Sequence, residues 1–163
     1  MHIFDHTTEC YKLFWFKAVL EKAEEGRRCI SYEEIVDDMI CTAWYMVSEY
    51  HLSLGPNDGL EKLIVSLQPS SMLKPSVEKK ELLAYLRSCG RSELKKEKMR
   101  LIRFVPYCIL SPFFPPQTRL DRYSGKAAAE KINSNEDAIY GISEYRGLDT
   151  LITIRDVRIC TSE

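Results

Sequence analysis

The residues best able to do chemistry in this 163-residue chain are lysines and arginines gathered in one short stretch. At 100° per residue, three of them, Lys96, Arg100 and Arg103, fall within about 60° of one another on one side of a helix. The opposite side carries apolar residues, so such a helix can pack on a core and hold a cationic stripe toward solvent. Positive charge at helical spacing suits the phosphate backbone of a nucleic acid. The full stretch consists of Arg87, Arg91, Lys95, Lys96, Lys98, Arg100 and Arg103.

Five residues of this stretch are candidate nucleic-acid contacts: Arg91, Lys95, Lys96, Arg100 and Arg103. No residue can be identified as aimed at base edges, so the expected contacts go to phosphate. Two alternatives remain open. The stretch is a solvated helix face paired with acidic residues elsewhere in the chain, or it is a surface for a protein partner.

Charge is unevenly distributed along the chain, although the overall net charge is only −1. Residues 1–70 carry 6 Lys/Arg and 12 Asp/Glu, whereas residues 71–126 carry 13 Lys/Arg and 5 Asp/Glu. Residues 127–163 carry 4 and 7. The net charges are therefore −6, +8 and −3. A basic middle segment can attract a polyanion, or it can dock on the chain's own acidic part.

Four carboxylates, Glu33, Glu34, Asp37 and Asp38, form two pairs at i,i+4 spacing. Stacked carboxylates can hold a divalent cation, but like charges at this spacing otherwise cost a little stability. Because no further ligand lies nearby in sequence, we predict a solvated acidic face, with docking of the basic helices as the alternative. His2, His6 and Cys10 also share helical spacing, but chain ends fray, and we expect no metal site there.

The sequence contains few residue patterns typical of catalysis or cofactor binding. No nucleophile has an identifiable base partner, and there is no glycine-rich phosphate loop, so we assign no catalytic residue and no cofactor. We expect that this chain alone is not an enzyme, and a metal-dependent enzyme is only a third alternative. Trp44, Tyr45, Tyr50 and His51 form an aromatic group that could stack bases beside a basic surface, or simply lie at the boundary of the core.

The six cysteines form no CxxC pair and have mainly apolar neighbours, which favours free thiols in a reducing cytoplasm. The amino-terminal residues show neither a basic nor an apolar signal region, and no apolar run approaches the ~18 residues of a membrane span. We therefore expect a cytoplasmic protein with no secretory signal and no membrane partner.

Helices must position these side chains. We predict helices over residues 8–25, with Thr7 or Thr8 as cap and Gly26 as stop, and from Ser31, which with Glu34 fits a capping box. Further helices are expected over 60–67, ended by Pro69, over 77–88, capped by Ser76, and over 93–104, capped by Ser92. A proline-rich apolar loop over 106–116, a helix over 126–132 and two strands over 138–145 and 151–155 complete the chain.

These patterns predict a mainly α fold, a helical bundle-like domain closed by a small C-terminal β-hairpin. We expect a single domain over 1–163, with an acidic helical part (1–70), a basic helical part (71–126) and a helix and hairpin end (127–163). The helix over 8–25 is apolar on nearly every side, which is typical of a central or interface helix.

Three segments, 39–52, 104–114 and 139–154, together with the helix around 11–16, carry a resemblance. The pattern resembles the amino-terminal region of poorly characterised bacterial proteins with an HNH endonuclease domain farther along. The HNH motif itself is absent, because the histidines stand at 2, 6 and 51, far from the predicted hairpin, so no nuclease residue can be transferred. The resemblance implies a helical accessory region and makes DNA a plausible associate by analogy.

The leading hypothesis is therefore a non-catalytic accessory or DNA-associated module that binds phosphate through a basic helix. The alternative is a protein-interaction or oligomerisation module with no nucleic-acid role, suggested by the apolar first helix and by Phe113-Phe114. The candidate partners are DNA, a second copy of the chain, or a nuclease domain.

Overall fold

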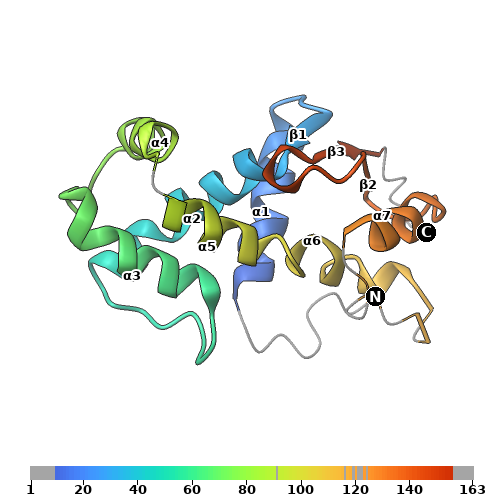
Figure 1. Ribbon diagram of the computed structural model, residues 1–163, viewed down its shortest axis with the longest axis horizontal. Helices are drawn as coiled ribbons and strands as arrows, with labels where there is room; N and C mark the ends of the chain where they lie inside the picture. The colour runs from blue at the N-terminus through green and yellow to red at the C-terminus, as the bar shows by residue number, and fades with distance from the viewer. Residues whose placement is uncertain are drawn as a thin grey trace, which may run out of the picture.

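The computed structural model describes residues 10–155, except 91, 116, 119, 121, 122 and 124. Helices dominate it, as predicted, and a small antiparallel sheet lies near the C-terminal end of the described part (Figure 1). The helices are α1 (Tyr11–Glu24), α2 (Tyr32–Ser48), α3 (Gly59–Ser71), α4 (Lys79–Ser88), α5 (Ser92–Leu101), α6 (Val105–Cys108) and α7 (Gly125–Asn133). The described residues also form the 3-10 turns η1 (Ser111–Phe113) and η3 (Gly147–Asp149). The strands are β1 (Cys29–Ser31), β2 (Tyr140–Ile142) and β3 (Leu151–Ile154).

Helix α2 begins at the predicted capping box. The Ser31 hydroxyl accepts a hydrogen bond from the Glu34 backbone N–H at 3.2 Å, and the Glu34 carboxylate accepts one from the Ser31 N–H at 3.0 Å. The two bonds satisfy donors that a helix start leaves unpaired. Farther along α2, the predicted apolar positions are buried against α1 and α3: Ile35, Val36, Met39, Ile40, Ala43 and Val47.

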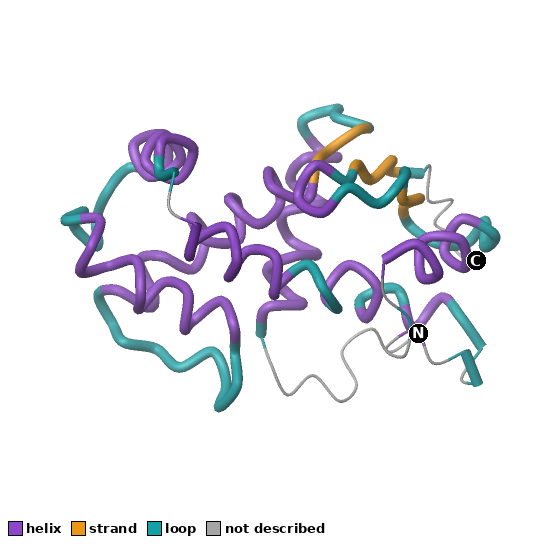
Figure 2. Tube along the Cα trace, in the orientation of Figure 1, coloured by secondary structure: helices purple, strands orange, loops and turns teal. Residues whose placement is uncertain are grey.

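The predicted hairpin is one part of a three-stranded sheet with the order β1-β3-β2 (Figure 2). Strand β3 lies in the centre, and its buried Ile152 pairs with Ile30 of β1 and Ile142 of β2. Strand β1 was not predicted, because three residues are too few for a hydrophobic period to be recognised. It leads directly into α2, and the Tyr32 N–H donates to the Thr150 carbonyl at 2.9 Å.

Several predicted helix ends are wrong. Helix α3 continues through Pro69 to Ser71. A proline has no N–H, so Pro69 leaves the Val65 carbonyl without its helical hydrogen bond, and Val65 is exposed to solvent. Helix α4 begins at Lys79, with Glu78 rather than Ser76 at its start. Helix α5 ends at Leu101, and the proline-rich segment contains the short helix α6, with Pro106 in its first turn.

Helix α1 ends at Glu24, and the predicted stop Gly26 follows two residues later with a φ of +77°, which favours glycine. The expected cap of this helix, Thr7 or Thr8, lies outside the described residues. One face of α1 enters the core through Trp15, Ala18 and Val19. The opposite side remains partly exposed. Helix α1 therefore covers the core from outside instead of running through its centre.

Candidate nucleic-acid interface

Helix α5 lies across α2 and is held on two flanks by close approaches. On one flank, a Cβ added to Gly59 at the start of α3 would meet Leu101 Cδ2 at 3.1 Å. On the other, a Cβ added to Gly147 of η3 would meet Met99 Sδ at 3.3 Å. Leu94 and Leu101 are buried beneath the helix. These contacts fix which side of α5 faces outward.

The outward side carries Lys96 and Arg100 of the predicted cationic stripe, and Arg103 follows two residues past the end of the helix. All three side chains are exposed, as is Lys95, and Arg100 keeps 75% of its side-chain surface accessible. Arg100 is paired with Glu97 of its own helix at 2.5 Å, and the Arg103 guanidinium lies 5.1 Å from the centre of the Phe104 ring. The fifth candidate, Arg91, lies outside the described residues.

Lys98 has the opposite placement. Its ammonium group is buried beneath α5, 2.6 Å from Asp37 Oδ1 and 3.2 Å from Glu33 Oε1, both on α2. Sequence reasoning placed Lys98 in the basic stretch without separating it from its neighbours. The signal was available, because at 100° per residue Lys98 falls about 40° from Leu94, on the apolar side of the helix.

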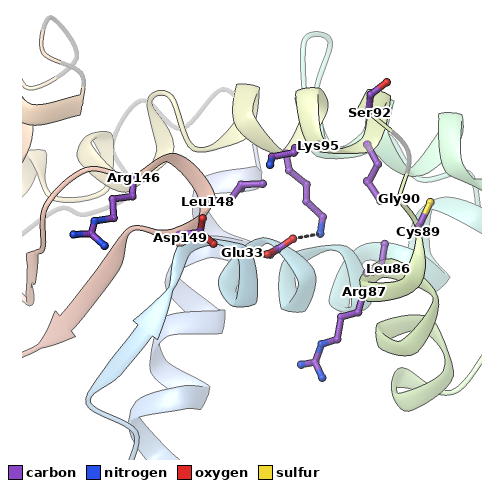
Figure 3. A pocket seen from close by; sticks show the side chains of 12 residues that line it. Glu33, Leu86, Arg87, Cys89, Gly90, Ser92, Lys95, Arg146, Leu148 and Asp149 are labelled. Atoms are coloured by element: carbon purple, nitrogen blue, oxygen red, sulfur yellow. Dashed lines mark hydrogen bonds and ion pairs between the residues drawn. The ribbon is translucent and has the colours of Figure 1, made fainter.

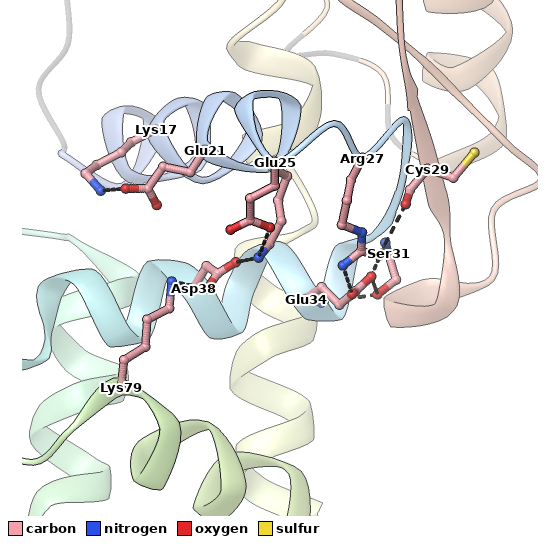
Figure 4. Close-up of polar contacts among 10 residues, drawn as sticks. Lys17, Glu21, Glu25, Arg27, Cys29, Ser31, Glu34, Asp38 and Lys79 are labelled. Carbon is pink, nitrogen blue, oxygen red and sulfur yellow. Dashed lines mark hydrogen bonds and ion pairs between the residues drawn. The ribbon is translucent and has the colours of Figure 1, made fainter.

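The acidic residues of α2 are therefore not a simple solvated face. Asp37 and Asp38 are both buried, and the alternative of docking on basic helices describes them better. Asp38 binds Lys22 of α1 at 3.0 Å and Lys79 of α4 at 2.8 Å (Figure 4). Together with the Asp37–Lys98 pair, these contacts tie α2 to three helices. Burial raises the pKa of Asp37, against the opposing effect of the Lys98 ammonium.

Two hollows flank α5. The first, of ≈230 Å³, lies between α2, the turn from α4 to α5, and η3, and Figure 3 shows Arg87 and Arg146 at its opposite ends. Lys95 lines it, but Arg146 is paired with Glu144 at 2.8 Å. The second hollow, of ≈300 Å³, lies between α3 and α5 and is lined by Tyr11, Asn57, Gly59, Lys62, Glu97, Arg100, Leu101, Phe104 and Val105.

The aromatic group at the end of α2 does not join this surface. Trp44 is buried, and its Nε1–H donates to the Lys74 carbonyl at 3.2 Å. Tyr45 and Tyr50 are exposed and meet edge to face at 5.4 Å, but neither lines the two hollows beside α5. The aromatic side chain that does lie beside the stripe is Phe104, which sequence reasoning did not select.

Within the part of the chain that the structure describes, no three His, Cys, Asp or Glu side chains gather as a metal site. His2 and His6 lie outside that part. The described cysteines at 10, 29, 41 and 89 are free thiols. No helix among the described residues is long and apolar enough to cross a membrane.

The chain was also compared with known proteins. No family model, no curated protein and no solved structure matches it.

Proposed function

We propose that this chain is a non-catalytic DNA-associated module that binds the phosphate backbone through α5, as an accessory part of an HNH-nuclease-like bacterial protein. The supporting observation is the division of charge on α5. Lys98 is buried in ion pairs with Asp37 and Glu33 of α2. The exposed cations, Lys95, Lys96, Arg100 and Arg103, make no ion pair with α2 among the described residues.

The buried side of α5 strengthens this proposal. Leu94, Leu101 and the Lys98–Asp37 pair hold the helix on the body of the molecule, so the stripe is presented on a fixed element. Preordered cations lose less conformational freedom on binding than mobile ones. Two of the three stripe residues are arginines, whose planar donor groups suit phosphate oxygens.

Charge reversal of the stripe tests the proposal. Binding of a fluorescent DNA oligonucleotide would be measured by anisotropy over a range of salt concentrations for the wild type and for the Lys96→Glu, Arg100→Glu, Arg103→Glu triple variant. Each lost phosphate contact lowers the slope of log K against log salt by about 0.9 for duplex DNA. We expect the triple variant to lose most of its affinity and most of its salt dependence.

A matched control changes net charge equally at other exposed lysines: Lys74→Glu, Lys80→Glu and Lys126→Glu. This control should bind more tightly than the stripe variant, because general attraction falls equally in both. Equal losses in the two variants would show that position on α5 does not matter. Unchanged binding in the stripe variant would exclude this surface.

The association with an HNH domain requires its own test. The gene would be sequenced beyond the codon for Glu163. A reading frame that continues into an HNH signature supports the association, and its absence leaves only the DNA-binding part. For this role we propose a cytoplasmic location, where the thiols stay reduced.

An interaction module is the second candidate, and it has an observation of its own. Leu13 and Leu20, two turns apart on α1, are 40% and 46% exposed. A dimer at micromolar concentration in light scattering that becomes a monomer on Leu13→Lys and Leu20→Lys substitution would favour it. The other apolar feature is weaker, because Phe113 and Phe114 are partly buried against the core.

A further inference from the structure

Phe104 is placed unusually for a large apolar side chain. It lies three residues past the end of α5 and leaves 41% of its surface exposed, although the neighbouring Ile102 and Val105 are buried. The Arg103 guanidinium lies over this ring, 5.1 Å from the ring centre, which is a cation–π contact. An aromatic ring at the end of a cationic stripe combines the two groups that single-stranded nucleic-acid sites use.

The ring also belongs to a hollow. Phe104 and Arg100 line the same ≈300 Å³ pocket between α3 and α5, whose volume is at the small end of the usual range for ligand sites, about 300–1,000 Å³. The Lys62 side chain lines this pocket from α3, and Asn57 lines it from the preceding turn. The pocket therefore offers an aromatic face, an amide and two cations beside the stripe.

One anionic group lies at the same site. Glu97 lines the pocket and is paired with Arg100 at 2.5 Å, so it partly neutralises the Arg100 cation. A carboxylate there repels phosphate but can accept a hydrogen bond from an N–H group of an unpaired base, such as the N3–H of thymine. The arrangement is thus better suited to a base inside the pocket, with phosphates outside it on the stripe.

We infer that this pocket receives an unpaired nucleobase, which stacks on Phe104 while Arg100 and Arg103 hold the flanking phosphates. The inference rests on the proposed function and names its substrate class, single-stranded nucleic acid. In a duplex the bases are stacked on one another and shielded by the backbone, so they cannot reach a ring at the level of the phosphates. A single strand can turn a base outward.

The test compares an oligothymidine with a duplex of equal length, each with a fluorescent label, on the full chain. Base stacking on one aromatic side chain justifies an expected loss of about ten-fold in single-strand affinity for Phe104→Leu. Duplex affinity should change less than about two-fold. The control is Tyr50→Leu, an exposed aromatic residue outside this pocket, which should leave both affinities unchanged.

A second variant gives a direct signal and does not depend on a loss of binding. Trp15 and Trp44 are buried, so in Phe104→Trp the new indole is the exposed one among the described residues. We expect oligothymidine to quench its fluorescence and the duplex to leave it unchanged. Thermal melts of both variants would verify that the fold is intact.

The outcomes separate the two proposals. If the charge-reversed stripe loses DNA binding but Phe104→Leu binds the single strand normally, the stacking pocket is overturned and the phosphate interface stands. Equal wild-type affinity for both forms also overturns the stacking pocket. If neither form binds at any salt concentration, both proposals are overturned.

Discussion

The two sides of α5 carry the same residue types and use them in opposite ways. On the inner side, Lys98 is buried against Asp37 and Glu33; on the outer side, Lys96, Arg100 and Arg103 face solvent. The inner charge is part of the packing between α5 and α2, and removing it should affect stability. The outer charges contribute little to packing, and removing them should affect only what binds. A count of basic residues cannot distinguish these roles.

The largest loss of stability is expected at the buried Lys98, on the inner side of α5. Lys98→Met leaves Asp37 buried without its counter-ion, which costs about 3–5 kcal/mol of unfolding free energy. Urea denaturation followed by circular dichroism would measure it. The double variant Asp37→Leu, Lys98→Met should recover most of this loss, because an apolar pair of similar volume replaces both charges. A double variant as unstable as the single one would mean that the ion pair is not the cause.

Glu34 and Asp37, two carboxylates of α2, should change the stability of the protein in opposite ways as the pH varies. Burial tends to raise the pKa of Glu34, but hydrogen bonds from Arg27 and Ser31 lower it to about 2. Its contribution to stability is therefore present above the unfolded pKa near 4.5 and is lost as the pH falls through about 2. The raised pKa of Asp37 acts in the reverse direction, with stability lost as the pH rises through the folded value.

Glu34→Gln should accordingly cost about 1 kcal/mol at neutral pH, the usual net size of a hydrogen bond. The difference from the wild type should shrink as the pH falls from 4.5 toward about 2, because the wild-type carboxyl loses its charge there. Urea unfolding at a series of pH values would show it. Parallel pH profiles for the two proteins would contradict the assigned role of the capping carboxylate.

An intermediate effect is expected at Asp38, which has two cationic partners. Lys79 is half exposed, with 51% of its side-chain surface accessible, and Lys22 remains on Asp38 when Lys79 is removed. Lys79→Met should therefore cost only about 0.5 kcal/mol. A loss as large as that of Lys98→Met would show that one lysine is not enough for Asp38.

The smallest effect on stability is expected at the exposed cations of the stripe. Lys96→Gln, Arg100→Gln and Arg103→Gln together should change the unfolding free energy by less than about 0.5 kcal/mol, since the side chains are exposed. Thermal and urea denaturation would measure it. A loss of several kcal/mol would abolish the contrast between the two sides and would weaken the charge-reversal experiment as a test of binding.

The local features of the fold were readable from the sequence. The capping box of Ser31 and Glu34, the stop at Gly26 and the helical phase of Ile35, Met39 and Ala43 are all present in the structure. Each depends on interactions within one or two turns of chain, so neighbouring residue types contain the information. For the same reason the shared phase of Lys96 and Arg100 was correct on α5, whereas Arg103 lies past the end of the helix and is exposed there.

Contacts between distant segments were not readable in this way. Strand β1 exists because Ile30 pairs with Ile152, more than a hundred residues later, and three residues carry no period of their own. The hollow lined by Phe104 forms where α3 and α5 meet, beside the close approach of Gly59 to Leu101. In both pairs, the residue type of one partner does not indicate which distant residue it contacts.

The sequence by itself determined that the fold is mainly α, where the capped helix begins, and that Lys96 and Arg100 share one side of a helix. Only the tertiary structure decided which cations remain exposed. A lysine leaves water only when another helix supplies carboxylates at the right depth, as α2 does for Lys98 with Asp37 and Glu33. That depends on the packing of α5 against α2, which residue spacing within either helix does not specify.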